Sequence, residues 1–428
     1  MNSFSTFIPS RRLAFLFLGM TSTLIGLGFD DPLGRPDAQP APILRTPFDP
    51  TLANKNVVFW KSVVVKDAQG AIARRELAGA YLARQRETGD IADAVLAEAA
   101  ARDSLAILPR NNHVALNRLA RALLTQHRFP EALEVADRAA KLDDQAERLR
   151  ADILIELGDL VGARKAVSRI TIMPDDLNGL ALKARMASAD GQPVVALKLL
   201  RQAAEKADDR PDMTAETVAW CHTMIGHTLI DSGKLDEGEA ECRKALEIFP
   251  KDYRAWTGLA EAATWRKDWD EVVKRAGEAL RLSPQNPEAL RLLGEARAEK
   301  GETKLADIEF GRFKQLAESF PQIYDRHWIL FCADHGWDLE STLTLARKDL
   351  KLRQDQGAYD ALAWACFKSG KVEEAQSAIA KATALPVQDG SIYLHDAAIA
   401  NAQGDLKRAR ESLEKAKALN PYLVAAPK

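Results

Sequence analysis

The stretch Arg254–Pro284, RAWTGLAEAATWRKDWDEVVKRAGEALRLSP, decides the fold of this chain. Its first half carries an apolar stripe at helical spacing, made of Trp256, Leu259, Ala260 and Ala263. The segment 267–270 interrupts this stripe. A second apolar stripe follows, made of Val272, Ala276, Ala279 and Leu280. Pro284 then ends the pattern, because proline lacks the amide hydrogen that a helix interior needs. The stretch therefore predicts two antiparallel helices joined by a tight turn.

The same pattern returns along the chain at intervals of 34 residues, as Gly226, Ala260 and Gly294 show. Small residues at these positions let the two helices of one hairpin approach closely, where a large side chain would hold them apart. A single hairpin cannot bury both of its faces, but stacking on its neighbours does so. The spacing predicts an all-α solenoid with one concave and one convex surface.

About ten such units fit the 428 residues. We expect four units over residues 73–205, three regular units over 206–318 and three over 319–428. The third, fourth and eighth units depart from the pattern. Terminal repeats need a cap, so we expect residues 56–72, which contain two valine-rich runs, to cover the first unit.

A 34-residue helical period is typical of tetratricopeptide repeats, which this sequence resembles over about 350 residues through its Trp/Leu/Gly, Ala, Ala/Phe and Pro positions. The resemblance implies a scaffold that holds peptides on its concave surface. The lysine and asparagine arrangement that some members use to clamp a C-terminal carboxylate is not found at the matching positions, which disfavours binding of chaperone tails.

The first 29 residues show a pattern that differs from the repeats. Arg11-Arg12 precede an uncharged stretch from Leu13 to Phe29, and Asp30-Asp31 follow it. This arrangement predicts a signal peptide or an N-terminal membrane anchor, with the repeats exported to the periplasm or exterior. The alternative is a buried helix of a soluble domain, but the stretch shows no amphipathic stripe. Residues 30–55, which are rich in proline, are expected to form a semi-rigid linker.

The sequence contains no motif that indicates catalysis. It lacks a zinc-protease helix, a nucleophile elbow, a phosphate-binding glycine loop and a Cys-x-x-Cys pair, so we expect a non-enzymatic protein without a cofactor or metal. His222 and His227 lie five residues apart, a poor geometry for sharing a metal on one helix. The net charge of −2, without a basic stripe, disfavours nucleic acid as a partner.

The four cysteines are expected to be small core residues. Cys221 and Cys242 fall in the two helices of one predicted hairpin, so a disulfide between them stays open as an alternative. An exported protein would meet an oxidising compartment.

The concave groove is the expected binding surface, since the first helix of each unit lines it. The residues one step beyond the core stripe are predicted to face the groove: Trp220, Thr223, His227, Asp231, Arg254, Thr257, Glu261, Trp265, Arg291, Glu295, Trp364 and Phe367. Aromatic and arginine side chains contribute most to interface energies. However, aromatic residues at helical spacing are more often core residues, which is the competing interpretation for Trp220, Trp265 and Trp364.

Together these features predict a scaffold that binds protein or peptide partners at the cell envelope, with possible membrane attachment through residues 13–29. Two alternatives remain at this stage. The chain could be a structural subunit of an envelope assembly or export complex, or an accessory domain that acts on an enzyme supplied by another chain.

Overall fold

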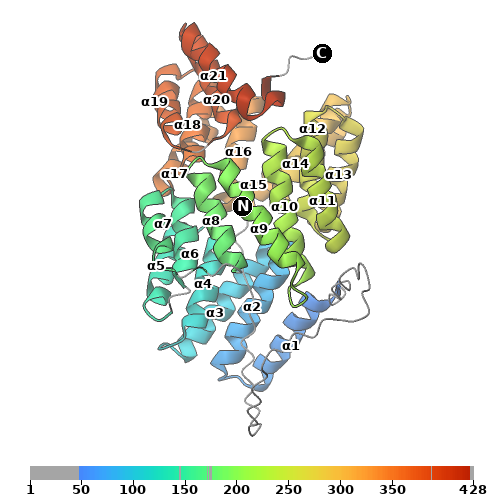
Figure 1. Cartoon of the computed structure of the whole chain (residues 1–428), viewed down its shortest axis with the longest axis vertical. Helices are drawn as coiled ribbons and strands as arrows, with labels where there is room; N and C mark the ends of the chain where they lie inside the picture. Colours follow the sequence, from blue (N-terminus) through green and yellow to red (C-terminus); the bar gives the residue numbers. More distant parts are fainter. Residues whose placement is uncertain (1–47, 144–145, 171, 173–175, 387, 425–428) are drawn as a thin grey trace, which may run out of the picture.

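A computed structural model of the chain describes residues 48–143, 146–170, 172, 176–386 and 388–424. Within these ranges it contains 21 α-helices and one short 3-10 helix, with no strand (Figure 1). The predicted signal segment and most of the proline-rich linker lie outside the described residues. None of the described helices is long and apolar enough to cross a membrane.

After α1 (Leu52–Lys66), the helices form ten consecutive hairpins, which we number as repeats 1 to 10. Repeats 1 to 5 are α2 (Ala71–Thr88) with α3 (Ile91–Ile107), α4 (His113–Thr125) with α5 (Phe129–Ala140), α6 (Ala146–Leu157) with α7 (Leu160–Val167), α8 (Leu177–Ala189) with α9 (Pro193–Asp208), and α10 (Ala215–Asp231) with α11 (Leu235–Ile248). Repeats 6 to 10 are α12 (Tyr253–Trp265) with α13 (Trp269–Leu282), α14 (Pro287–Glu299) with α15 (Thr303–Ser319), α16 (Pro321–His335) with α17 (Leu339–Leu352), α18 (Gln356–Lys368) with α19 (Val372–Ala384), and α20 (Gly390–Ala402) with α21 (Leu406–Leu419). The predicted all-α solenoid of about ten repeats is confirmed.

The hairpins are held together at the positions that the sequence reserves for small residues. A Cβ atom added to Gly226 of α10 would lie 2.5 Å from the Sγ atom of Cys242 in α11 and 3.0 Å from the backbone oxygen of Gly238. Only glycine therefore permits this approach of the two helices. The four cysteines are buried free thiols, so the structure does not contain the Cys221–Cys242 disulfide.

Polar side chains at the helix N-termini connect repeats 6 and 7 to the repeats before them. Asp252 caps α12 by accepting from the Arg254 amide, and its second carboxylate oxygen accepts from the Thr223 hydroxyl of α10 at 2.7 Å. Asn286 caps α14 and donates to the Thr257 hydroxyl of α12 at 2.8 Å. Each of these capping residues therefore satisfies a free amide at the start of its own helix and also bonds to the helix of the preceding repeat.

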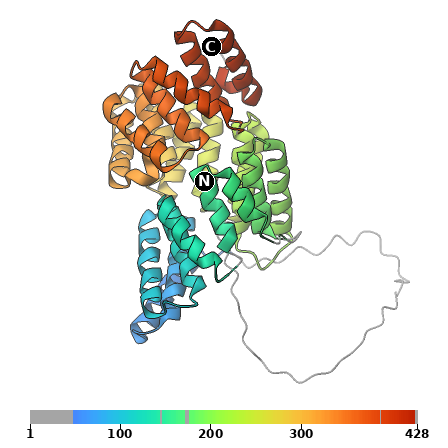
Figure 2. The same ribbon diagram turned by 90° about the vertical axis from the view of Figure 1, so that its left-hand side faces the viewer.

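The superhelix is wound tightly enough for its successive turns to touch (Figures 1 and 2). Gln354, in the loop after repeat 8, donates its amide hydrogen to the carbonyl of Leu157 in repeat 3 at 3.2 Å. Arg353 lies over the ring of Phe129 in repeat 2, 5.4 Å from its centroid. These partners are more than 190 residues apart in sequence, so the contacts join distant repeats in a way that no single repeat determines.

Glycine makes one of these contacts possible. Gly191, in the turn of repeat 4, has φ of 70°, and a Cβ atom there would collide with the backbone oxygen of Pro386, in the loop between repeats 9 and 10. A side chain at this position would be strained by the left-handed backbone and would also push two turns of the superhelix apart.

The N-terminal cap is a helix that begins earlier than predicted. Helix α1 starts at Leu52, inside the range 30–55 that we expected to be linker, and ends at Lys66 within the expected cap 56–72. Ala53 and Val57 are buried, and Trp60 and Val64 pack against the core of repeat 1. The linker boundary therefore moves to the residue before the helix.

Candidate functional site

The candidate site is the concave side of repeats 5 to 9, lined by the first helix of each repeat. The twelve predicted groove residues lie on four of these helices. Trp220, Thr223, His227 and Asp231 belong to α10, the next four to α12, Arg291 and Glu295 to α14, and Trp364 and Phe367 to α18.

Three of the twelve do not face the groove. Trp220, Thr223 and Thr257 are buried. Trp220 packs in the core that repeats 4 and 5 share, while the two threonine hydroxyls bond to Asp252 and Asn286 of the following repeats. The prediction was wrong for these residues, because neighbouring repeats already cover the helix face one step beyond the core stripe: the preceding repeat covers Trp220, and the following repeats cover the two threonines.

Trp265 is also less exposed than predicted. Its ring is half-buried and packs against the core of repeats 5 and 6, which includes Leu235 and Leu259. The competing interpretation of Trp265 as partly a core residue therefore fits its position better than an open groove residue. Trp256 packs against the cores on both sides of it, as expected for a structural residue.

A charged cluster on α10 and α12 brings together His227, Asp231 and Glu261. His227 donates from Nε2 to the backbone oxygen of Arg254 at 2.9 Å, and its Nδ1 lies 3.2 Å from a Glu261 oxygen. Burial alone would lower the pKa of His227, but these acceptors raise it to about 9, so the imidazole is a cation at neutral pH. Asp231 is exposed at the end of α10, yet crowding by the surrounding protein and repulsion from Glu261 raise its pKa.

Two arginines beside this cluster are held by carboxylates. Arg254 donates to Asp252 at 2.9 Å and to Glu216 at 3.2 Å, and the second oxygen of Glu216 accepts from Arg86 of repeat 1 at 3.4 Å. Glu216 thus connects two turns of the superhelix. Arg291 donates to Glu288 and, at 2.6 Å, to Glu295. These guanidinium groups are fixed in position, as a recognition surface requires, but part of their charge is already neutralised.

Glu87, near the Arg86–Glu216 contact, lines a cavity of about 260 Å³ between α1 and repeats 1 and 6. Arg84, Lys251 and Arg281 also line this cavity. Burial and the negative charge of Glu216 raise the pKa of Glu87 to about 7. The proton on this carboxylate therefore responds to pH near neutrality.

Trp364 and Phe367 form an aromatic stack on the concave side of repeat 9. The Trp364 ring stacks on His395 of repeat 10 with centroids 4.1 Å apart and on Phe367 at 5.3 Å. Its indole Nε1 donates to Asp334 of repeat 8 at 2.7 Å. The stack therefore joins three repeats, and both residues are only partly exposed.

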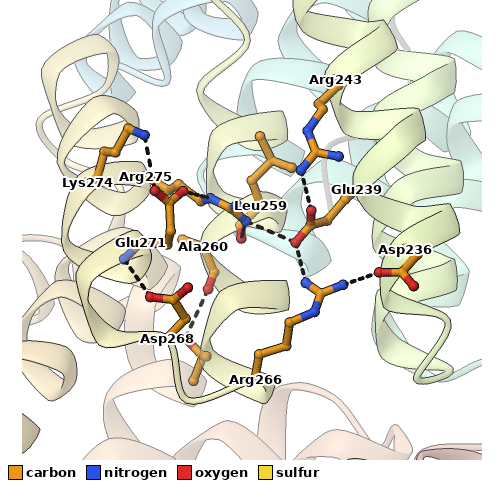
Figure 3. Close-up of polar contacts among 11 residues, drawn as sticks. Asp236, Glu239, Arg243, Leu259, Ala260, Arg266, Asp268, Glu271, Lys274 and Arg275 are labelled. Carbon is orange, nitrogen blue, oxygen red and sulfur yellow. Dashed lines mark hydrogen bonds and ion pairs between the residues drawn. The ribbon is translucent and has the colours of Figure 1, made fainter.

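A second polar cluster, which the repeat pattern did not predict, is built around the buried carboxylate of Glu239 in α11 (Figure 3). Glu239 accepts from Arg243, from Arg266 and, at 3.0 Å, from Arg275. Arg275 also donates to the backbone oxygen of Leu259 at 2.8 Å. Burial raises the pKa of Glu239, but the three guanidinium groups lower it below its ordinary value, so the cluster is an ionised clamp between repeats 5 and 6. Glu239 and Arg275 are 36 residues apart, close to the length of one repeat, and this spacing could have indicated the pair in the sequence.

The described residues show little that resembles catalytic chemistry. They contain no group of three or more His, Cys, Asp or Glu side chains placed to hold a metal ion. Burial raises the pKa of the Cys221 and Cys242 thiols, which keeps them protonated and unreactive at neutral pH.

The comparison with known sequence families agrees with this architecture. Residues 117–176 and 221–252 match tetratricopeptide repeat families. A stretch of 68 residues is 32% identical to the cell division cycle protein 27 homolog of Caenorhabditis elegans, covering 16% of this chain and 9% of that protein. A solved structure described as the APC/C hetero-tetramer Cut9–Hcn1 covers 87% of this chain and 85% of its own, with 13% identity and a TM-score of 0.46. With two matched regions and ten stacked helix hairpins of the corresponding kind, the chain is a tetratricopeptide repeat protein.

Proposed function

We propose that this protein is a non-catalytic scaffold that holds a protein or peptide partner on the concave side of repeats 5 to 7. The observation that carries the proposal is the row of half-exposed ionic side chains on α10, α12 and α14, which the stacking fixes in place. Proteins of this family bind protein partners, and the rigid spacing of their repeats suits an extended segment.

The charges of the cluster indicate what the partner offers. Asp231, Glu261 and Glu288 crowd the concave side, and the raised pKa of Asp231 shows that its negative charge is disfavoured there. His227, beside Glu261, and Arg291, bonded to Glu288, compensate only in part. A lysine or arginine side chain of a partner would relieve this repulsion, so we expect a segment with basic residues.

Capture of partners by the full chain, followed by titration of the captured partner, tests the proposal. We expect the double variant Asp231→Asn, Glu261→Gln to weaken binding several-fold, with the loss diminishing at high salt. Asp270→Asn serves as the control, because Asp270 lies on the second helix of repeat 6 with its side chain 84% exposed. Equal binding by the two variants would contradict the proposal. A stoichiometric complex that resists salt would instead indicate a structural subunit of an assembly.

We also propose that the scaffold works at the cell envelope, with its repeats in the periplasm or exterior. The support is the sequence of residues 1–31, in which an arginine pair precedes the apolar stretch and two aspartates follow it. Cell fractionation combined with N-terminal sequencing tests the location. Recovery of the intact chain in the soluble cytoplasmic fraction would refute it.

A further inference from the structure

Helix α1 has two apolar faces, and the described part of the chain covers only one of them. Ala53 and Val57 point inward and are buried, with Trp60 and Val64 packed beside them against repeat 1. The opposite stripe of the helix, which we call the outer face of α1, also carries large apolar side chains. Leu52 is 49% exposed, Val58 66%, Phe59 56% and Val65 82%.

This outer face is unusual for a solenoid cap. The terminal element of a repeat array normally presents a polar surface, because nothing else stacks on it. Here four large apolar side chains face solvent along one helix, and Ile72 at the start of α2 is 58% exposed as well. Figure 1 shows α1 at one end of the array, beside α2.

The charges of the helix identify what covers it. Residues 52–66 contain three lysines and no acidic residue. Lys55 and Lys66 lie on the same stripe as the apolar side chains, near the two ends of the helix. Lys55 forms an ion pair of 2.9 Å with Asp49, just before the helix, and its side chain remains 66% exposed. Apolar residues flanked by lysines are typical of helices that lie in the interface of a membrane with anionic lipids.

We propose that the outer face of α1 lies on an anionic lipid surface, with Val58, Phe59 and Val65 entering the boundary between headgroups and acyl chains. A second copy of the chain fits less well. Stable protein interfaces bury about 800 Å² per partner, more than four side chains on one helix supply, and facing copies would oppose their lysines. The contact would stand the solenoid on its end and leave the concave side in water. This inference does not depend on the partner proposed for that side.

Fluorescent labelling of the full chain in vesicles tests the inference. Ser62 lies on the outer face of α1, so Ser62→Cys can carry an environment-sensitive dye. Lys407→Cys, at a side chain that is 88% exposed in α21, is the matched control. The four native cysteines are buried thiols with raised pKa values, so the dye should label the introduced cysteine selectively.

In vesicles that contain phosphatidylglycerol we expect a blue shift, and protection from an aqueous quencher, at position 62 and neither at position 407. Adding Val58→Ser and Phe59→Ser should abolish the shift without changing the helix content measured by circular dichroism. Vesicles of phosphatidylcholine alone should give a weaker shift. Equal water exposure of the two probes would overturn the inference. A shift at position 62 that appears without lipid and grows with protein concentration would also overturn it, in favour of self-association.

Discussion

The concave side of repeats 5 to 7 and the outer face of α1 differ in how their side chains are satisfied. On the helices that line the concave side, Thr223 and Thr257 are buried against the following repeats, and Arg254 donates to two carboxylates. On α1, Val65 is 82% exposed, and Phe59 is 56% exposed although the edge of its ring contacts Trp60. The difference teaches that helical phase alone does not decide exposure in a solenoid. The next repeat and the next superhelical turn decide it.

The largest change in stability is expected from a substitution in the interior of a repeat. Gly226→Leu places a side chain where even a Cβ atom would meet Cys242 at 2.5 Å, and overpacking of this kind costs about 1–3 kcal/mol. Gly277→Leu is the control, because no atom lies within 4 Å of a Cβ added to Gly277 in α13. Leucine has a higher helix propensity than glycine, so the control should be neutral or stabilising by up to about 1 kcal/mol. Urea denaturation measures both, and equal stability of the two variants would contradict the packing described.

The next prediction concerns the contact between two turns of the superhelix. Gly191→Ala and Gly404→Ala both place alanine at a positive φ, 70° and 78°, which costs about 1–2 kcal/mol in each case. Only Gly191 faces another turn, at Pro386, whereas Gly404 has no atom within 4 Å of its added Cβ. We expect a larger radius of gyration by small-angle scattering for Gly191→Ala alone. An unchanged radius in both variants would show that the two turns do not hold each other.

These turn contacts mark the limit of what the sequence could predict. The helices α11, α13 and α15 begin at Leu235, Trp269 and Thr303, one 34-residue period apart, so the repeat pattern alone located them. The ion pair of Arg86 with Glu216 joins residues 130 positions apart, and no local pattern marks such a pair. Trp220 was misassigned for a related reason. Spacing along one helix indicates which residues share a face, but not how closely a neighbouring repeat covers it.

A smaller effect should appear in the pH dependence of stability. The pKa of Glu87 is raised from 4.5 to about 7, so the folded chain binds this proton more tightly than the unfolded chain. Its contribution to stability is therefore full below pH 4.5 and is lost as the pH rises to about 7. Glu87→Gln should remove that loss, so the free energy of unfolding should fall less between these pH values than in the unaltered chain.

Glu131→Gln provides a control of opposite sign. Arg128 lowers the pKa of Glu131, so the stability that Glu131 adds is present above its ordinary pKa of 4.5 and is lost on acidification. Urea denaturation over a pH series measures both variants. Identical pH profiles for Glu87→Gln and the unaltered chain would show that Glu87 does not titrate in this range.

The smallest effect is expected on the outer face of α1, and its contrast with the inner face tests the comparison directly. Val57 is 1% exposed and packs in the core of repeat 1, whereas Phe59 is 56% exposed two residues later. Val57→Ser removes buried apolar atoms and buries a hydroxyl, so the free energy of unfolding should fall by about 1–3 kcal/mol. Phe59→Ser should change it by less than about 0.5 kcal/mol, as surface substitutions usually do. Thermal or urea unfolding of the lipid-free protein measures both. If Phe59→Ser destabilised the chain as much as Val57→Ser, Phe59 would be packed within this protein, and its side chain would not be free to contact a lipid surface.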